Sequence, residues 1–230
     1  MTKTRYILSL LFTFSTFYSS YSQSSNTKLS LSDKKATKNT IQLYQNLHKT
    51  VNKGILFGHQ DDLAYGVNWK YEEGRSDVKD VVGDYPAVYG WDLGGLENKS
   101  DKNIDGIPFD KMRQYIIDGH NRGGVITISW HPNNPLTGGN AWDTTPKSLA
   151  SALPGGVSHE KFKTWLDEAA KYILTLRDKK GDLIPILYRP YHELTGTWFW
   201  WCKNNGSPEE FKTLWKFTLC GAIAAGNLIL

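Results

Sequence analysis

Cysteine is scarce in this chain of 230 residues, which contains only Cys202 and Cys220. Two cysteines can form a disulfide in an oxidising compartment. Between them, residues 208–217 have the apolar spacing of a helix, and a helix of ten residues is about 15 Å long. The Cα atoms of a disulfide must approach within about 7 Å. We therefore predict that these two cysteines do not form a bridge.

Several other patterns are absent. The chain has no Gly-x-Gly-x-x-Gly loop and no Gly-Lys-Ser phosphate loop, which argues against nucleotide binding. The net charge of +4 is small and no long basic run occurs, so neither nucleic acid nor an anionic membrane surface is expected as a partner. No apolar stretch reaches the roughly 20 residues of a membrane span. We expect neither a cofactor nor a metal.

The N-terminal segment contains an apolar stretch at residues 6–14, preceded by Lys3 and Arg5. Small residues follow the stretch, which completes the pattern of a secretory signal peptide. We therefore predict a signal peptide at residues 1–22 and export to the periplasm or the extracellular space; a membrane-anchored N-terminus is the alternative. Residues 23–39, rich in Ser, Lys and Thr, are predicted to be a flexible lead-in.

Helical and extended patterns then alternate four times, which indicates an α/β fold. The strands are mostly continuous apolar runs, as expected where helices cover both faces of a parallel sheet. Polar or aromatic residues follow each strand, a placement typical of (β/α)₈ barrels and of open doubly wound sheets. Helices are predicted at 40–49, 76–82, 109–122, 161–177 and 208–217, and strands at 54–62, 86–92, 124–131 and 184–188.

The most informative segment is RPYHELTGTWFWW, residues 189–201. Glu193 lies just after a predicted strand and shortly before four consecutive aromatic residues. Apolar rings around a carboxyl group favour its protonated form, because burial disfavours the charge. Such rings also stack on the C–H faces of sugars, so the combination suits cleavage of a glycosidic bond. The alternative is a surface glutamate beside a packed tryptophan cluster.

Four segments, in this order, resemble glycoside hydrolase family 26, the β-mannanases and their relatives. They are LFGHQDD at 56–62, AVYGWD at 87–92, SWHPNNP at 129–135 and RPYHE at 189–193 with its WFWW tail. The resemblance covers roughly residues 40–217. It implies a (β/α)₈ TIM barrel, with the first four to five βα units in this chain and a catalytic domain at 40–230.

The resemblance also implies an activity and a set of site residues. The activity is that of a retaining endo-β-glycanase of the mannan endo-1,4-β-mannosidase type, acting on β-1,4-mannan, galactomannan or glucomannan. Glu193 matches the general acid/base. His131 and His192 match residues that line the cleft, Trp198 matches a tryptophan at the cleavage point, and Trp142 matches a stacking residue at a neighbouring subsite. The alternatives are core histidines and a loop anchor.

A retaining glycosidase needs a second carboxyl group about 5–5.5 Å from the first. The resemblance places this chain in the clan of retaining (β/α)₈ glycosidases, in which the second carboxyl group is a glutamate at the end of the seventh strand. Residues 218–230 lack the charged face of an outer barrel helix, although 227–230 resemble the start of a fifth strand. We therefore expect a domain that is incomplete at its C-terminus, without the nucleophile.

Two alternatives to a mannanase follow from the resemblance and stay open. One is a carbohydrate-binding remnant without the nucleophile, for which the acids at strand ends, Asp61, Asp62 and Asp92, are the candidate substitutes. The other is a hydrolase of xylan or mixed-linkage β-glucan.

Half a barrel would also leave the edges of its first and last strands unpaired, which favours aggregation or pairing with another chain.

Overall fold

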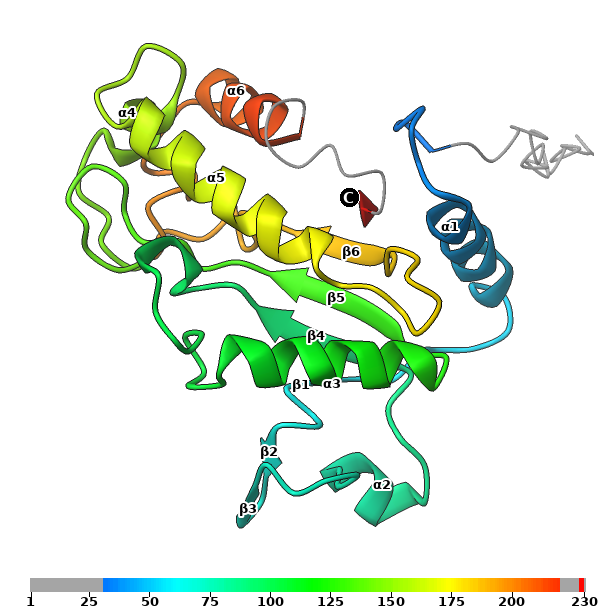
Figure 1. Cartoon of the computed structure of the whole chain (residues 1–230). Helices are drawn as coiled ribbons and strands as arrows, with labels where there is room; N and C mark the ends of the chain where they lie inside the picture. Colours follow the sequence, from blue (N-terminus) through cyan, green and yellow to red (C-terminus); the bar gives the residue numbers. More distant parts are fainter. Residues whose placement is uncertain (1–30, 220–227, 230) are drawn as a thin grey trace, which may run out of the picture.

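The computed structural model describes residues 31–219 and 228–229. Its centre is a parallel sheet in which the strands lie side by side in the order β1–β4–β5–β6–β7, the order in which they follow along the chain (Figure 1). A doubly wound sheet reverses its strand order at one point, whereas a barrel adds strands in sequence. The observed order therefore favours the barrel. The strands are β1 (Gly58–Gln60), β4 (Val88–Asp92), β5 (Val125–Ser129), β6 (Ile186–Arg189) and β7 (Leu228–Ile229).

Helices connect these strands, and every helix predicted from the sequence is present within a few residues of its expected bounds. The fifth strand suggested by residues 227–230 is also confirmed, since Leu228 and Ile229 pair in parallel with Ile186 and Leu187. The helices are α1 (Lys38–Thr50), α2 (Asp77–Val82), α3 (Phe109–Asn121), α4 (Ser148–Ala152), α5 (His159–Leu174) and α6 (Pro208–Phe217), with a 3₁₀ helix η1 (Leu96–Asn98).

Side-chain caps explain where several helices begin. The Ser76 side chain accepts a hydrogen bond from the N–H of Lys79 and so caps α2. Helix α6 starts with a capping box, in which the side chains of Ser207 and Glu210 accept hydrogen bonds from each other's backbone N–H groups. Such contacts satisfy N–H groups that have no partner inside the helix.

The core lies between the sheet and the helices α3 and α5. Met112 and Ile116 of α3 and Phe162 and Leu166 of α5 are fully buried. From the sheet side, the ring of Trp130 stacks against Phe162, with 6.3 Å between ring centroids. Burial of these large apolar side chains supplies the main driving force for the layer.

Burial alternates along β5, where Ile126 and Ile128 are buried while the residues between and beside them are only partly buried. The prediction that helices cover both faces of the sheet is therefore wrong for this strand. Helices cover one face. In a barrel the other face is the interior, which is filled by side chains from other strands and not by helices.

A small substructure, formed by the hairpin β2 (Tyr65–Gly66) and β3 (Trp69–Lys70) together with α2, projects below the sheet (Figure 1). The carboxylate of Asp77 joins its parts, because it accepts hydrogen bonds from the N–H of Val67 at 2.8 Å and from the indole of Trp69 at 2.5 Å. A Cβ at Gly66 would lie 2.3 Å from this carboxylate, so the turn requires glycine.

Some expectations fall on other parts of the chain. The predicted signal peptide at 1–22 and Cys220 lie outside the described residues, and the lead-in at 23–39 is described only from residue 31. Cys202 is buried with a free thiol. Among the described helices, none is long and apolar enough to cross a membrane.

Candidate active site

Three polar side chains from neighbouring strands meet at the C-terminal edge of the sheet. Asp92 ends β4, His131 follows β5, and His192 follows β6. The parallel register places Asp92 beside Ser129, and Ser129 beside Arg189. The residues that leave the sheet after these positions are therefore neighbours in space, although 39 positions separate Asp92 from His131 and 61 separate His131 from His192 in the chain.

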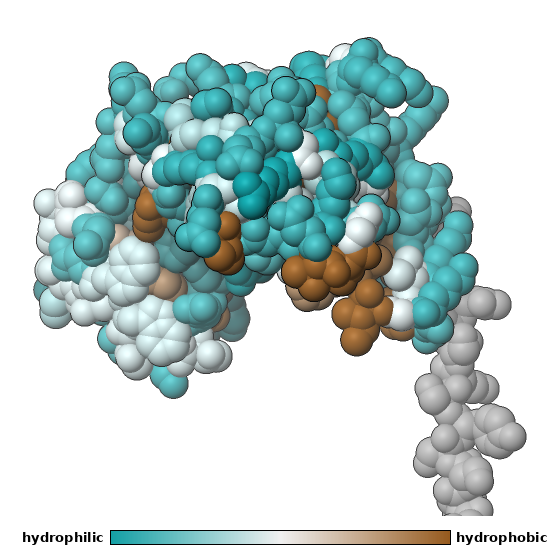
Figure 2. All heavy atoms as spheres, turned by 90° about the horizontal axis from the view of Figure 1, so that it is seen from below, coloured by the Kyte–Doolittle hydropathy of each residue, from teal (hydrophilic) through white to brown (hydrophobic). Residues whose placement is uncertain are grey.

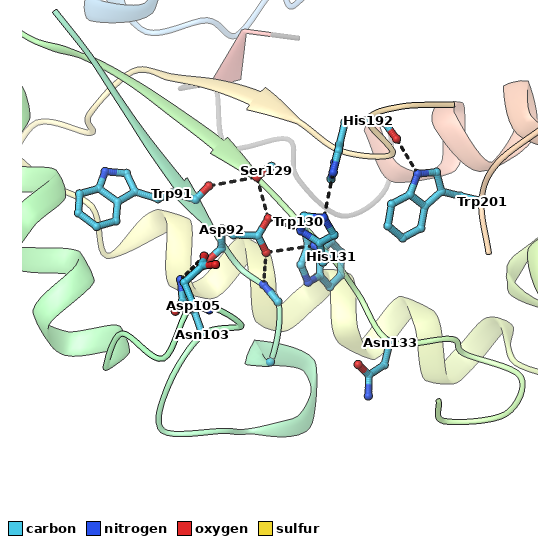
Figure 3. A network of polar contacts seen from close by, with 12 residues as sticks. Trp91, Asp92, Asn103, Asp105, Ser129, Trp130, His131, Asn133, His192 and Trp201 are labelled. Atoms are coloured by element: carbon cyan, nitrogen blue, oxygen red, sulfur yellow. Dashed lines mark hydrogen bonds and ion pairs between the residues drawn. The ribbon is translucent and has the colours of Figure 1, made fainter. Parts of the chain in front are cut away.

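Asp92 is almost fully buried, at 2% exposure, and its carboxylate is surrounded by hydrogen-bond donors (Figure 3). Oδ1 accepts the backbone N–H groups of Gly94 at 2.7 Å and His131 at 3.1 Å. Oδ2 accepts the hydroxyl of Ser129 at 2.7 Å and lies 2.8 Å from Nδ1 of His131. Burial alone would raise the pKa of Asp92, but His131, Ser129 and Gly94 outweigh it and the pKa is lowered.

The imidazole of His131 links Asp92 to His192. Nε2 of His131 lies 3.0 Å from Nε2 of His192, and the two rings meet edge to face. His192 is buried, and burial together with the neighbouring His131 and Arg189 lowers its pKa to about 4. The His192 ring is therefore neutral at neutral pH. The structure brings together the two histidines that the sequence predicts at the site.

Trp142 reaches the same place from the loop between β5 and α4. Its ring stacks on His131, with 5.3 Å between centroids and 9° between planes, while 49% of the residue stays exposed. The loop is held by the buried Asn134, whose side-chain amide donates to the carbonyl of Asp143 and the hydroxyl of Ser148. Trp142 is thus a supported aromatic surface beside the histidines.

Glu193 lies on the surface beside Trp198. Its carboxylate accepts a hydrogen bond of 2.8 Å from the indole N–H of Trp198, itself 47% exposed. The backbone at Glu193 is left-handed, with φ of 57°. A Cβ at Gly196 would come within 2.6 Å of the Trp198 ring, so glycine lets the ring fold over this turn.

The aromatic run does not wall in Glu193, and this part of the sequence prediction is wrong. Phe199, Trp200 and Trp201 are buried, and only Trp198 contacts the carboxylate. Successive side chains of a turn point in different directions, so a run of four rings cannot surround one group. The buried indoles instead hold the backbone, because Trp201 donates to the carbonyl of His192 and Trp200 to that of Pro132.

The other acids at strand ends have partners of their own. Asp61 is fully buried and accepts a hydrogen bond from the hydroxyl of Tyr65 at 3.1 Å. Burial, with the negative charge of Asp105 next in weight, raises the pKa of Asp61 to about 7. Asp62 pairs with Nδ1 of His59 at 3.0 Å. None of the contacts of the described residues joins a second carboxyl group to Glu193, and none of their His, Cys and acidic clusters suits a metal ion.

Sequence reasoning missed the part that Asp92 and Glu97 play in supporting the site. Asp92 was visible as a carboxylate at a strand end, but its partner lies 39 residues later. Glu97, in η1, accepts the N–H of Asn133 at 2.8 Å and the indole N–H of Trp130 at 3.2 Å, and its burial raises its pKa. It holds the segment around His131, and no local sequence signal marks that role.

Comparisons with known proteins agree with this geometry. The model of the family described as glycosyl hydrolase family 26 matches residues 32–221. Among curated proteins, a mannan endo-1,4-β-mannosidase of Bifidobacterium adolescentis is 34% identical over 203 residues, which cover 85% of this chain. Among solved structures, a β-mannanase of this family from Bacteroides ovatus superposes with a TM-score of 0.82 at 46% identity, over 84% of this chain.

A second solved structure is similar over the same region. The catalytic domain of an endo-β-1,4-mannanase from Bacillus sp. JAMB-750 superposes with a TM-score of 0.79 at 34% identity, over 87% of this chain. The chain spans 57% of the Bacteroides structure, 55% of the Bacillus structure and 20% of the Bifidobacterium protein. It therefore spans only part of the relatives it matches.

Proposed function

The chain belongs to glycosyl hydrolase family 26, a family of (β/α)₈ barrels, and on this basis we propose that it carries the acid/base half of an endo-β-mannanase active site. The substrate is β-1,4-linked mannan, including galactomannan and glucomannan. The observation that supports this most directly is the position of Glu193, exposed at the edge of the sheet and hydrogen-bonded to the half-exposed Trp198.

The chemistry assigned to Glu193 is proton transfer in both halves of a retaining reaction. It protonates the oxygen of the leaving sugar and later removes a proton from the water that releases the second product. A second carboxyl group must supply the nucleophile. Asp61, Asp62 and Asp92 are each engaged elsewhere. We therefore expect the 230-residue chain to bind mannan but to release few reducing ends.

Trp142 and Trp198 supply the binding surface in this proposal. Each exposes about half of its area, and each is held from behind, Trp142 by stacking on His131 and Trp198 by its hydrogen bond to Glu193. Flat apolar rings held in this way suit the C–H faces of a β-linked sugar chain. His131 and His192 supply polar groups next to these rings.

The first test measures binding and cleavage by the purified 230-residue chain. Retention on insoluble mannan should be clear and should fall on Trp142→Ala or Trp198→Ala, whereas Trp69→Ala, outside the site, should leave it unchanged after correction for folded fraction. Release of reducing ends from galactomannan should be near background. Robust release that Glu193→Gln abolishes would show instead that the chain assembles a complete site.

The second test isolates the proton transfer. In an active chimera that continues this chain into the remaining strands of the Bacteroides ovatus β-mannanase, Glu193→Ala should reduce kcat/KM on mannan by about 10²–10⁴. Formation of the glycosyl-enzyme from a substrate with an activated leaving group should lose much less, because that step needs no proton. Equal losses on both substrates would contradict the assignment.

Substrate class is tested with the same proteins. Retention on xylan or mixed-linkage β-glucan in place of mannan would move the proposal to another activity. Retention on mannan by a folded chimera that shows no turnover would favour a carbohydrate-binding role for this chain.

We place the protein outside the cytoplasm, as a secreted protein, on the strength of the signal-peptide pattern at residues 1–22. N-terminal sequencing of the protein from its host should then begin at or near Gln23. A soluble cytoplasmic form that retains Met1 would contradict export.

A further inference from the structure

Three side chains form a continuous hydrogen-bonded series from the core of the sheet to the site, from Asp92 through His131 to His192 (Figure 3). Each imidazole nitrogen acts as a donor or an acceptor according to the tautomer of its ring. Once the donor and acceptor are known at one end of the series, the donor and acceptor of every other hydrogen bond in it follow. The contacts of Asp92 and of His192 each supply this information.

The Asp92 end is fixed by backbone groups. Oδ1 of Asp92 faces the N–H groups of Gly94 and His131, which are donors in every state of the protein. Oδ2 faces Nδ1 of His131 at 2.8 Å, and an ionised carboxylate can only accept. Nδ1 of His131 must therefore carry a proton and donate it to Asp92.

The His192 end points the same way. Nδ1 of His192 is buried and has no hydrogen-bond partner in the described part of the chain. Buried N–H groups without an acceptor are rare because they lose their hydrogen bonds to water. The proton of His192 therefore belongs on Nε2, which then donates to Nε2 of His131 at 3.0 Å.

We propose that Asp92 is a positioning residue that sets the tautomers of both histidines, with the proton of His131 on Nδ1 and that of His192 on Nε2. This role rests on the proposed function for its catalytic meaning, since His131 supports the ring of Trp142 and His192 adjoins Glu193. The hydrogen bond from Nδ1 of His131 to Asp92 fixes the orientation of the His131 ring. On His192, the residue before Glu193 in the sequence, Nδ1 stays unprotonated.

Asp92→Asn gives a sharp expectation, because the amide has only one acceptor atom. The backbone N–H groups of Gly94 and His131 retain the oxygen at the Oδ1 position. The NH₂ group then takes the Oδ2 position and donates to Nδ1 of His131. That ring moves its proton to Nε2 and donates to Nε2 of His192, which must move its own proton to Nδ1.

The direct measurement is long-range ¹H–¹⁵N correlation NMR of the whole chain labelled on its six histidines, which reports which ring nitrogen carries the proton. In the wild type at neutral pH, His131 should carry it on Nδ1 and His192 on Nε2. In Asp92→Asn both should switch. A merely structural role for Asp92 would leave both tautomers as they are in the folded variant.

Two control variants test whether the tautomers depend on the direction of the hydrogen bonds or on the charge and packing around Asp92. Asp105→Asn removes a nearby negative charge that acts on Asp92 but has no hydrogen bond to His131. Ser129→Ala removes one donor to Asp92 and leaves its carboxylate in place. Both should keep the wild-type tautomers. If Asp92→Asn does not fold, Ser129→Ala together with the wild-type spectrum still tests the assignment.

Affinity for mannohexaose supplies the functional readout. It should fall about tenfold in Asp92→Asn, the size expected when a buried polar pair is mismatched, and should change little in Asp105→Asn. Wild-type His131 protonated on Nε2 or on both nitrogens, or an Asp92→Asn variant with unchanged tautomers, would overturn the proposal. If neither protein binds manno-oligosaccharide, the proposed function fails, while the NMR result still decides the tautomers.

Discussion

Asp61 shows how one buried carboxyl group can make stability depend on pH. It follows β1 with no exposure to solvent, and among the described residues only the hydroxyl of Tyr65 donates to its side chain. Burial, and then the negative charges of Asp105 and Asp92, raise its pKa to about 7 from the ordinary value of 3.8 for an aspartate. The folded state therefore keeps a proton that the unfolded chain releases.

The stability that this proton supplies should be complete below about pH 4 and lost as the pH rises to about 7. Asp61→Asn replaces the carboxyl group with an amide, which does not ionise in this pH range. The free energy of unfolding of Asp61→Asn minus that of the wild type should therefore increase by up to about 1.4 kcal/mol per pH unit across this window. Urea denaturation at several pH values measures the difference.

The low pKa of His192 gives the opposite trend between about pH 4 and 6.5, but it is common to both proteins and cancels in the difference. Asp101→Asn, at an exposed aspartate, is the matched control and should show no such trend. A constant difference between Asp61→Asn and the wild type over the whole pH range would contradict the assignment to Asp61.

At this scale the sequence indicated which side chains lie close together but not how they touch. His131 and His192 do meet, as expected from strand ends that share one edge of a parallel sheet, and Trp142 of the loop after β5 stacks on His131. The burial of Glu193 was predicted wrongly, because the orientation of each ring in the turn after β6 depends on backbone dihedrals such as the positive φ at Glu193. A sequence pattern without periodicity cannot supply those angles.

At the scale of elements, helix α6 illustrates why long amphipathic segments were predicted well. Pro208 stands at its start, Glu209 and Glu210 fill its first turn, and Ser207 completes a capping box. Each of these is a local signal that the chain itself displays. The hairpin β2–β3 and helix α4 were missed because two-residue strands and a five-residue helix show no period.

The N-cap of α6 allows the contribution of one such local signal to stability to be measured. Ser207→Ala removes the acceptor for the N–H of Glu210 and should lower the free energy of unfolding by about 1 kcal/mol. Ser207→Asp keeps an acceptor and adds a favourable charge at the helix N-terminus, so it should stay close to wild type. Thermal or urea denaturation of the three proteins gives the comparison; equal loss in both variants would point to packing around Ser207 and not to the cap.

At the scale of the whole molecule, the described sheet ends in β1 on one side and β7 on the other, and each pairs with a single neighbour. The segment that leads into β1 also exposes aliphatic and aromatic side chains, with Ile55 97% and Phe57 61% exposed. Figure 2 shows hydrophobic surface gathered in a patch on one face of the molecule. Unpaired strand edges beside exposed apolar side chains favour association with another chain.

The 230-residue chain should therefore self-associate as its concentration rises. Phe57→Lys places a charge beside the β1 edge and should reduce the mean mass measured by light scattering at a given concentration. Val67→Lys, at a similarly exposed position in the β2–β3 turn, adds the same charge away from the sheet and is the control. Equal effects of the two variants would indicate that net charge alone, and not the strand edge, controls association.

The agreement between strand order and chain order has a consequence for synthesis on the ribosome. Each strand of the sheet, as it emerges, finds its pairing partner already made, since β4 adds to β1, β5 to β4, and β6 to β5. A strand that pairs with an earlier strand does not stay unpaired until a distant part of the chain is made. N-terminal parts of a chain generally fold first during translation. Asp92 and His131 are then made before His192, Glu193 and Trp198 leave the exit tunnel, so the later half of the candidate site meets partners that already exist.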